Sequence, residues 1–213
     1  MVPAEKIKTC IFLNKEICMN FEGINIVITR FTRIEDESAW EIPSHAHMNY
    51  ELHYIYDGTG KIGLGNNFFE VSRGDFYICP PFIDHSQSAD TENPMKEFCI
   101  ECTLGIQETE DAECKQNDNS FLLQLIGRIL YCKHSDSHGV LKRNFALLNT
   151  MFEEHVKLDE GEELLAKSLL LNTILSMLIY SKKDSCSNGF GQNRSDIGYQ
   201  RASSIKNYLE ANY

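Results

Sequence analysis

The residues of this sequence best suited to chemistry are three histidines and one glutamate in two short segments. SHAHMNYELH contains His45, His47 and Glu51, and GDFYICPPFIDH ends at His85. Imidazole nitrogens and a carboxylate form a donor set for a divalent transition metal, and nothing in the sequence selects among Zn, Ni, Mn and Fe. The alternative is a polar cavity whose groups hydrogen-bond to one another without a metal.

We interpret the first segment as part of one strand, in which residues of equal parity point to the same side. His45, His47 and Glu51 then share a face, and His53 lies on it as well. The opposite face carries a more apolar set: Tyr50, Leu52, Tyr54 and Tyr56. Histidines and a carboxylate on a face that has no lysine suggest the lining of a ligand cavity rather than a solvated surface.

Trp40 is the single tryptophan and lies just before this segment. An indole ring at this position could stack on a sugar ring, or it could pack at the rim of a barrel, which is the commoner use. The candidate ligand-binding residues are therefore Trp40, His45, His47, Glu51, His53 and His85.

The segments around these residues have the pattern of short β-strands, from Phe21 to about Leu104. INIVITRF places Ile24, Ile26 and Ile28 on one face, at the period of two that a half-buried strand requires. KEFCIECTL repeats this pattern with Phe98, Ile100, Cys102 and Leu104. Turn signals rich in glycine, asparagine and proline separate the strands, which predicts an antiparallel sandwich or barrel.

Helical periodicity replaces this pattern after an acidic, turn-rich connector at residues 107–119. Helices are expected at about 121–131, 142–157 and 162–182. The third helix has leucines on two faces, and both faces need to be buried. Its second face could be covered by the other helices or by the same helix of a second subunit, and the sequence leaves both alternatives open.

The overall charge excludes some partners for this part of the chain. Lys and Arg total 20 and Asp and Glu total 31, which gives a net charge of -11. Phosphate binding and docking on anionic lipid both need a basic surface. The N-terminus has no apolar stretch of signal-peptide length, and the stretch Leu164–Tyr180 is interrupted by polar residues, so we expect it to be too short and too polar to span a bilayer. A cytoplasmic protein without a membrane partner is predicted.

The two histidine segments resemble the paired motifs of the cupin superfamily, which are small β-barrels or jelly rolls. The resemblance implies that the three histidines and Glu51 are metal ligands. Three positions depart from the family pattern, because Ala39, Phe82 and Ala89 stand where two glycines and an asparagine are usual. These departures weaken an enzymatic interpretation more than the fold.

A narrower resemblance covers nearly the whole chain. HAHMNYELHYIYDGTGKI followed by GDFYICPPFIDHS is similar to the sensor domain of AraC/XylS-type transcriptional regulators. The resemblance implies a mainly β fold with α, in which a cupin-like barrel precedes a small helical dimerisation subdomain. It also implies no catalytic residues, a small-molecule effector such as a sugar or other metabolite, and a homodimer through residues 162–182.

The same resemblance divides the chain. We expect a ligand-binding barrel with an N-terminal arm at 1–106, the acidic connector and dimerisation helices at 107–183, and a flexible linker at 184–196. Residues 197–213 resemble the first helix of a helix-turn-helix DNA-binding domain, and DNA would be contacted only through the remainder of that domain. The alternative function is a metal-dependent cupin enzyme of the dioxygenase or isomerase type.

Overall fold

The structure is a computed structural model that describes residues 7–13, 16–21, 24–106, 132–154 and 159–183. The acidic connector, the first expected helix, the linker and the expected C-terminal helix lie outside these residues. The strands are β1 (Thr9–Ile11), β2 (Ile17–Phe21), β3 (Ile24–Ile34), β4 (Glu41–His45), β5 (Tyr50–Asp57), β6 (Thr59–Leu64), β7 (Asn67–Ser72), β8 (Asp75–Cys79), β9 (His85–Ala89), β10 (Lys96–Ile106) and β11 (His134–Ser135). Two helices, α2 (Val140–Glu154) and α3 (Glu160–Lys183), follow.

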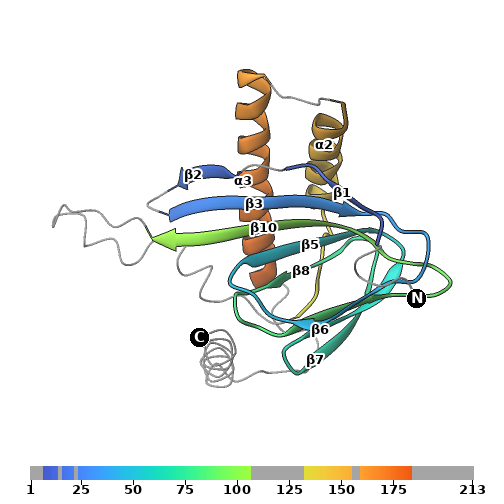
Figure 1. Ribbon diagram of the computed structural model, residues 1–213. Helices are drawn as coiled ribbons and strands as arrows, with labels where there is room; N and C mark the ends of the chain where they lie inside the picture. The colour runs from blue at the N-terminus through green and yellow to red at the C-terminus, as the bar shows by residue number, and fades with distance from the viewer. Residues whose placement is uncertain (1–6, 14–15, 22–23, 107–131, 155–158, 184–213) are drawn as a thin grey trace.

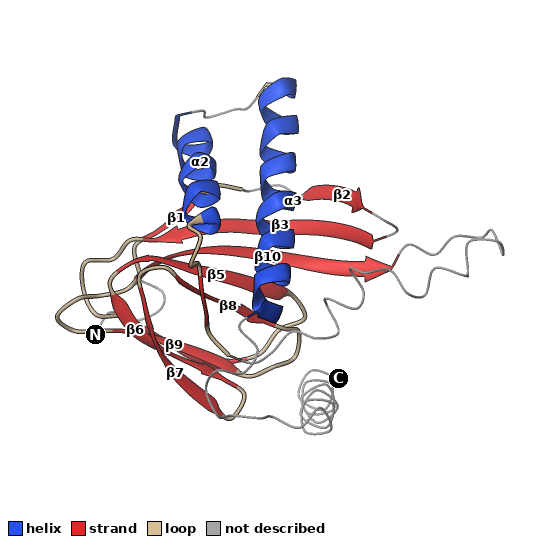
Figure 2. Cartoon of the chain, turned by 180° about the vertical axis from the view of Figure 1, so that it is seen from behind, coloured by secondary structure: helices blue, strands red, loops and turns tan. Residues whose placement is uncertain are grey.

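The strands form two antiparallel sheets that face each other. The larger sheet has the order β1-β3-β10-β5-β8-β11, with β2 also paired to β3, and the smaller sheet has the order β4-β9-β6-β7. In Figures 1 and 2 the two helices lie against the outer face of the larger sheet, while β6, β7 and β9 cover its inner face. This arrangement confirms the prediction of a mainly β, cupin-like barrel followed by helices.

Two hydrophobic cores follow from the alternation of side chains along the strands. One core lies between the larger sheet and the helices and contains Ile24, Ile26, Ile28, Phe98, Ile100 and Cys102, as the sequence pattern predicted. The other lies inside the barrel and includes Ile55, Ile62, Leu64 and Met95. The strands β5 and β8 contribute to both cores, one from each face, whereas the buried apolar residues of β10 lie only in the core beneath the helices.

An irregularity in β3 shifts this alternation partway along the strand. Glu101 pairs with Arg30 and Cys102 pairs with Ile28, which leaves Thr29 as an extra residue opposite their junction. A bulge of this kind moves the following residues to the other face. Phe31 therefore joins Ile28 in the core beneath the helices, although the two residues differ in parity.

The turn between β5 and β6 depends on a glycine. Gly58 has a φ of +73°, and a Cβ atom at this position would lie 2.1 Å from the carbonyl oxygen of Pro94. Only glycine combines this backbone conformation with so close a contact.

The helix α3 buries one face on the rest of the molecule. Of the apolar residues on the two predicted faces, Leu178 is buried in this core, whereas Leu164 and Leu165 are exposed. Ala166, Leu170, Ile174 and Met177 are fully buried. By length and composition Glu160–Ser181 could cross a membrane, with a mean hydropathy of 1.5, which corrects our expectation that this stretch is too short and too polar. A core helix meets the same criteria, and the buried face accounts for part of its apolar residues, while Leu164 and Leu165 remain exposed.

The aromatic stack beneath α2 provides a test of this core. Phe145 is fully buried and stacks on Tyr54 and Phe98, with ring centroids 5.2 and 5.1 Å apart. Phe145→Ala is expected to lower the free energy of unfolding by about 3–5 kcal/mol, because it leaves a cavity. Phe68→Ala removes a ring that is 78% exposed and should change it by less than about 0.5 kcal/mol. Equal effects in urea unfolding would contradict the packing described.

Candidate functional site

The three histidines and Glu51 meet at the mouth of the barrel, but not along a single strand. The strand β4 ends at His45 in the smaller sheet, whereas β5 begins at Tyr50 in the larger sheet, and His47 lies in the connection. His85 opens β9 and pairs directly with His45. The expected convergence is therefore present, but the interpretation of this segment as one continuous strand was wrong.

A backbone contact holds the two histidine segments together. The amide of Phe82 donates a hydrogen bond of 2.8 Å to the carbonyl oxygen of His47. Phe82 has a φ of 62°, a left-handed conformation that favours glycine, and it occupies a position where the resembling family has glycine. The backbone thus keeps the glycine conformation despite the larger side chain, and strain of this kind is concentrated at functional sites.

Glu51 lies within ion-pair distance of three imidazoles. Its Oε1 is 3.1 Å from Nε2 of His47, and its Oε2 is 3.2 Å from Nε2 of His85 and 3.0 Å from Nε2 of His53. His45 completes the group from the open side, with its ring centroid 4.2 Å from that of His85.

Backbone carbonyls select the tautomers of two of these histidines. Nδ1 of His45 lies 2.9 Å from the carbonyl oxygen of Pro43, and Nδ1 of His85 lies 2.9 Å from that of Ile83. A carbonyl oxygen can only accept, so each Nδ1 must carry the proton that it donates. The neutral rings therefore present an Nε2 lone pair, which is the form of imidazole that coordinates a metal.

Burial and charge shift the pKa values of the cluster in different directions. Burial lowers the pKa of His45. Contact with the Glu51 carboxylate raises the pKa of His47, against the effect of burial. Burial by itself would raise the pKa of Glu51, but its contacts with His47, His53 and His85 outweigh burial and hold the pKa far below the ordinary value. Glu51 is thus a carboxylate, as a metal ligand must be.

Two buried nitrogens without hydrogen-bond partners also support a divalent metal at this donor set. Nε2 of His47 and Nε2 of His85 are buried, and neither has a hydrogen-bond partner. The Glu51 oxygens are close enough to these nitrogens for ion pairs, yet the directions do not make hydrogen bonds. Donor atoms of His45, His47 and His85 all lie within 4.8 Å of one another. Unpaired nitrogens that converge on one point can hold a metal ion.

A buried polar network supports Glu51 from within the barrel. His53 lies between two carboxylates, with Nδ1 3.2 Å from Oε1 of Glu97, and it stacks on Tyr77 at 4.5 Å. The Tyr77 hydroxyl donates to Oε2 of Glu97 at 3.2 Å and accepts from Gln87 at 2.6 Å. His53 is only 2% exposed, and its Nε2 lies 3.0 Å from Oε2 of Glu51. Its contact with Glu51 therefore holds that carboxylate in place.

Sequence reasoning missed Glu97, Tyr77 and Gln87. Gln87 follows His85 by two residues and therefore faces the same side, which is a usable signal. Glu97 alternates with the apolar face of β10 and could have been recognised as a charged residue that points into the barrel.

Trp40 packs inside the barrel. Its side chain is fully buried, and Nε1 donates a hydrogen bond of 3.1 Å to the carbonyl oxygen of Met95. A role in ligand binding stays a prediction that requires the ring to be uncovered. Two cavities, of about 390 and 620 Å³, are lined by other residues, so the predicted ligand-binding residues line neither of them.

Two further groupings near Glu51 include cysteines, but their thiols are poor metal ligands. Donor atoms of Glu51, His53 and Cys99 lie close together, as do those of Glu51, Cys79 and His85. Burial raises the pKa of Cys79 to about 11 and raises the pKa of Cys99 still further above its ordinary value. Both thiols are therefore protonated at neutral pH, whereas a metal binds the thiolate.

Comparison with known proteins gives a match over more than half of the chain. The sequence profile of the AraC-like ligand-binding domain matches residues 30–174. The uncharacterized protein MJ1618 of Methanocaldococcus jannaschii is 34% identical over 70 residues, which are 32% of this chain and 54% of that protein. The chain thus matches about half the length of this relative.

Solved structures similar to the chain are cupins of low identity. An RmlC-like cupin from Shewanella frigidimarina is 15% identical, with a TM-score of 0.31, over 46% of this chain and 86% of that one. Oxalate decarboxylase of Bacillus subtilis, whose structure is described with Mn(II) centres, is 13% identical, with a TM-score of 0.31, over 50% and 30%. Salicylate 1,2-dioxygenase of Pseudoaminobacter salicylatoxidans is 12% identical, with a TM-score of 0.34, over 50% and 32%.

The geometry predicts a metal site that depends on His45. This side chain is exposed, so His45→Ala should fold normally, yet it removes one of the converging nitrogens. Calorimetric titration of the chelator-treated chain with Zn²⁺ or Mn²⁺ should show affinity at least about tenfold weaker than for the unmodified chain. His138→Ala, which removes an exposed histidine outside the cluster, is the control. Equal affinity of the two variants would contradict the site.

Proposed function

The chain belongs to the family of AraC-like ligand-binding domains, and from this premise we propose that it is the effector-sensing and dimerisation domain of an AraC-type transcriptional regulator. In this function a small molecule, a sugar or another metabolite, binds at the barrel mouth and contacts His45, His47, Glu51 and His85. Binding controls how a C-terminal domain engages DNA. We assign the DNA contact to that domain because the net charge of -11 disfavours direct contact between DNA and this part of the chain.

The observation that carries this proposal is that the two faces of β5 contact different parts of the molecule. Glu51 and His53 point into the barrel, where they contact the histidine cluster and its buried network. Leu52 and Tyr54, the alternate residues, belong to the core that packs against α2 and α3. One strand thus lies between the proposed effector site and the helices.

Coupling through this strand needs two arrangements that differ in effector affinity. An effector shifts the balance only by the difference between its affinities for the two. A displacement of Glu51 along β5 would move Leu52 and Tyr54 against the helices, because the core is close-packed and transmits small shifts. The helices would then present the DNA-binding domains of two subunits at a different spacing.

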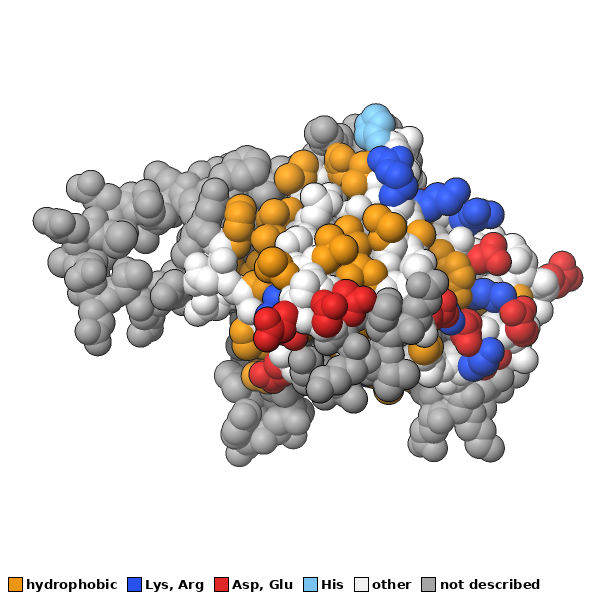
Figure 3. All heavy atoms as spheres, turned by 90° about the horizontal axis from the view of Figure 1, so that it is seen from above, with side chains coloured by type: hydrophobic (Ala, Val, Ile, Leu, Met, Phe, Trp, Pro, Cys, Tyr) orange, Lys and Arg blue, Asp and Glu red, His pale blue; other side chains and the backbone are white. Residues whose placement is uncertain are grey.

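The helices also carry the proposed dimer surface. Leu164 and Leu165 of α3 are 67% and 58% exposed, and Leu147 of α2 is 57% exposed. Figure 3, which views the molecule from above, shows hydrophobic side chains gathered over a broad area of this face. Large exposed apolar groups that lie together mark interaction surfaces. We therefore place a homodimer contact on α3, which spans the predicted residues 162–182.

The proposed cofactor is one divalent ion of Zn, Ni, Mn or Fe, held by the three histidines and Glu51. Such an ion would supply a positive charge and an open coordination position for an oxygen of the effector. The protein itself holds the donor atoms in place, through the carbonyls of Pro43 and Ile83 and the buried His53. We place the protein in the cytoplasm, in keeping with transcriptional regulation.

The same donor set also favours a second candidate function, a metal-dependent cupin enzyme of the dioxygenase or isomerase type. Such an enzyme needs a bound metal with an open coordination position. Metal analysis of protein purified without chelator separates the two functions: stoichiometric metal with turnover indicates the enzyme, and metal without turnover indicates a metal-assisted sensor.

The sensor function predicts saturable binding at the barrel mouth. Calorimetric titration of the metal-loaded chain with a panel of sugars and small metabolites should identify a binder. His47→Ala should weaken its binding by at least about tenfold, because a buried polar contact is lost, and His138→Ala should leave it unchanged. An unaffected His47→Ala variant, or a broad panel without any binder, would contradict the proposal.

The dimer contact predicts sensitivity to a charge on α3. Sedimentation velocity of the 213-residue chain should give a dimer. Leu165→Glu should raise the dissociation constant at least about tenfold, because a carboxylate would be buried in an apolar interface. Phe68→Glu, a change at an exposed phenylalanine on β7, should leave the dimer intact. A monomeric chain would contradict the homodimer, and a dimer indifferent to Leu165→Glu would contradict the contact on α3.

A further inference from the structure

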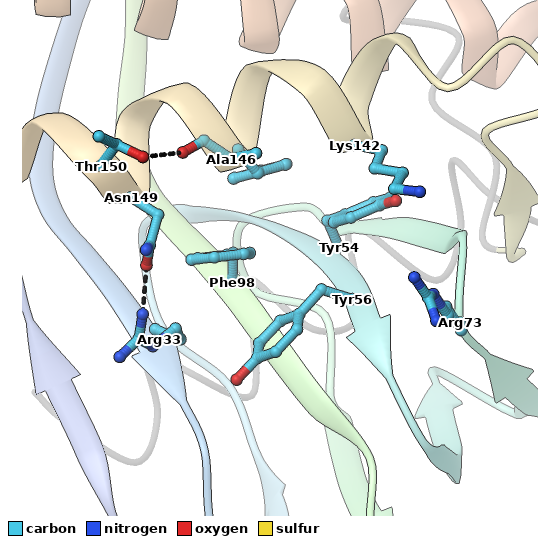
Figure 4. A pocket seen from close by; sticks show the side chains of 10 residues that line it. Arg33, Tyr54, Tyr56, Arg73, Phe98, Lys142, Ala146, Asn149 and Thr150 are labelled. Atoms are coloured by element: carbon cyan, nitrogen blue, oxygen red, sulfur yellow. Dashed lines mark hydrogen bonds between the residues drawn. The ribbon is translucent and has the colours of Figure 1, made fainter.

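A second candidate ligand site lies outside the barrel, between the larger sheet and α2. It is a cavity of about 390 Å³, within the range of roughly 300–1,000 Å³ that is typical of small-molecule sites. Its floor comes from β3, β5 and β10, its roof from α2, and one end from the turn between β7 and β8. Figure 4 shows that Tyr54, Tyr56 and Phe98 project into the space beneath the helix. This is the face of β5 that points away from the histidine cluster.

Cationic side chains stand at both ends of this cavity, although the chain as a whole is strongly acidic. Arg33 at one end is already neutralised, because its guanidinium pairs with Glu35 at 2.6 Å and with Glu153 at 2.5 Å. Arg73 and Lys142 stand at the other end (Figure 4), and neither forms an ion pair with any residue that the structure describes. Two cations without partners favour an anion there.

The space between the two ends is lined by aromatic and small polar groups. Tyr56 and Phe98 lie against each other, with ring centroids 4.8 Å apart. The Tyr56 hydroxyl is committed to the carbonyl oxygen of Ile34, at 3.3 Å, so the rings offer mainly apolar surface to the cavity. Aromatic walls of this kind bind flat apolar bodies by offset or edge contacts.

We infer that this cavity binds a small organic carboxylate with a planar apolar body. The carboxylate lies between Arg73 and Lys142, and the body lies against Tyr56 and Phe98. Such a ligand contacts the sheet and α2 at the same time, so it fastens the helix to the barrel. This site goes beyond the proposed effector site, because it uses the opposite face of β5 and none of the histidines.

The test uses 2-naphthoate as the probe and the 213-residue chain as the protein. Calorimetric titration should show saturable binding of 2-naphthoate and much weaker binding of 2-naphthamide, which keeps the ring system but lacks the charge. Arg73→Gln and Lys142→Gln should each weaken 2-naphthoate binding about fivefold, and the double variant should weaken it more than about tenfold. Arg143→Gln is the matched control, because it removes an exposed cation from the same helix outside the cavity.

The possible results are distinct. Absence of binding, equal binding of the acid and the amide, or equal losses in Lys142→Gln and Arg143→Gln would each overturn the inference. His47→Ala should leave 2-naphthoate binding unchanged, whereas it should weaken an effector bound at the barrel mouth. Failure of this site and failure of the proposed function are therefore separable.

Discussion

The structure of the site depends on one carboxylate placed between the two sheets. Glu51 extends from the larger sheet and lies within 3.2 Å of nitrogens on His47, His53 and His85. A carboxylate that is largely removed from water is costly unless cations or donors compensate it. His53, whose Nε2 lies 3.0 Å from the carboxylate, and His47, whose pKa the carboxylate raises, provide this compensation, and the low pKa of Glu51 expresses it. The same contacts determine where the smaller sheet, which carries His45 and His85, meets the larger sheet.

Much of this architecture could be predicted from the residue pattern. Alternation identified which residues of β3 and which residues of β10 share a face, and Ile24, Ile26, Ile28, Phe98 and Ile100 all lie in the core beneath the helices. Two expected helices appear as α2 and α3, with ends that differ by a few residues. The meeting of the histidine segments was also foreseen, because residue types that share a chemistry indicate a site even when the path of the chain between them is misread.

The remaining features could not be predicted from the sequence because they depend on contacts between distant segments. The break between β4 and β5 assigns His45 and Glu51 to different sheets, which no local pattern records. The extra residue Thr29 is visible only once β10 is paired with β3. The partnership of His53 with Glu97 joins residues that are 44 positions apart. Phe82 keeps a glycine-like conformation that its residue type would not suggest.

The two faces of β5 give the domain a physical route between ligand chemistry and helix packing. The cluster at the barrel mouth and the aromatic core beneath α2 are separated by the thickness of one strand, and Arg33 ties that helix to β3 through hydrogen bonds to Asn149 and Glu153. Membership in a family of ligand-binding domains is consistent with this layout. The hydrogen bond from the Phe82 amide to the carbonyl oxygen of His47 and the buried network around His53 both stabilise one particular arrangement of the barrel mouth.

The most direct measurement is X-ray absorption at the metal edge of the chain loaded with one equivalent of Zn²⁺ or Mn²⁺. Scattering from several imidazole rings together with a carboxylate oxygen is the result that this account predicts, since His45, His47, His85 and Glu51 converge at the barrel mouth. Sulfur scatterers, a shell of oxygen alone without imidazole rings, or failure to retain the ion would contradict it.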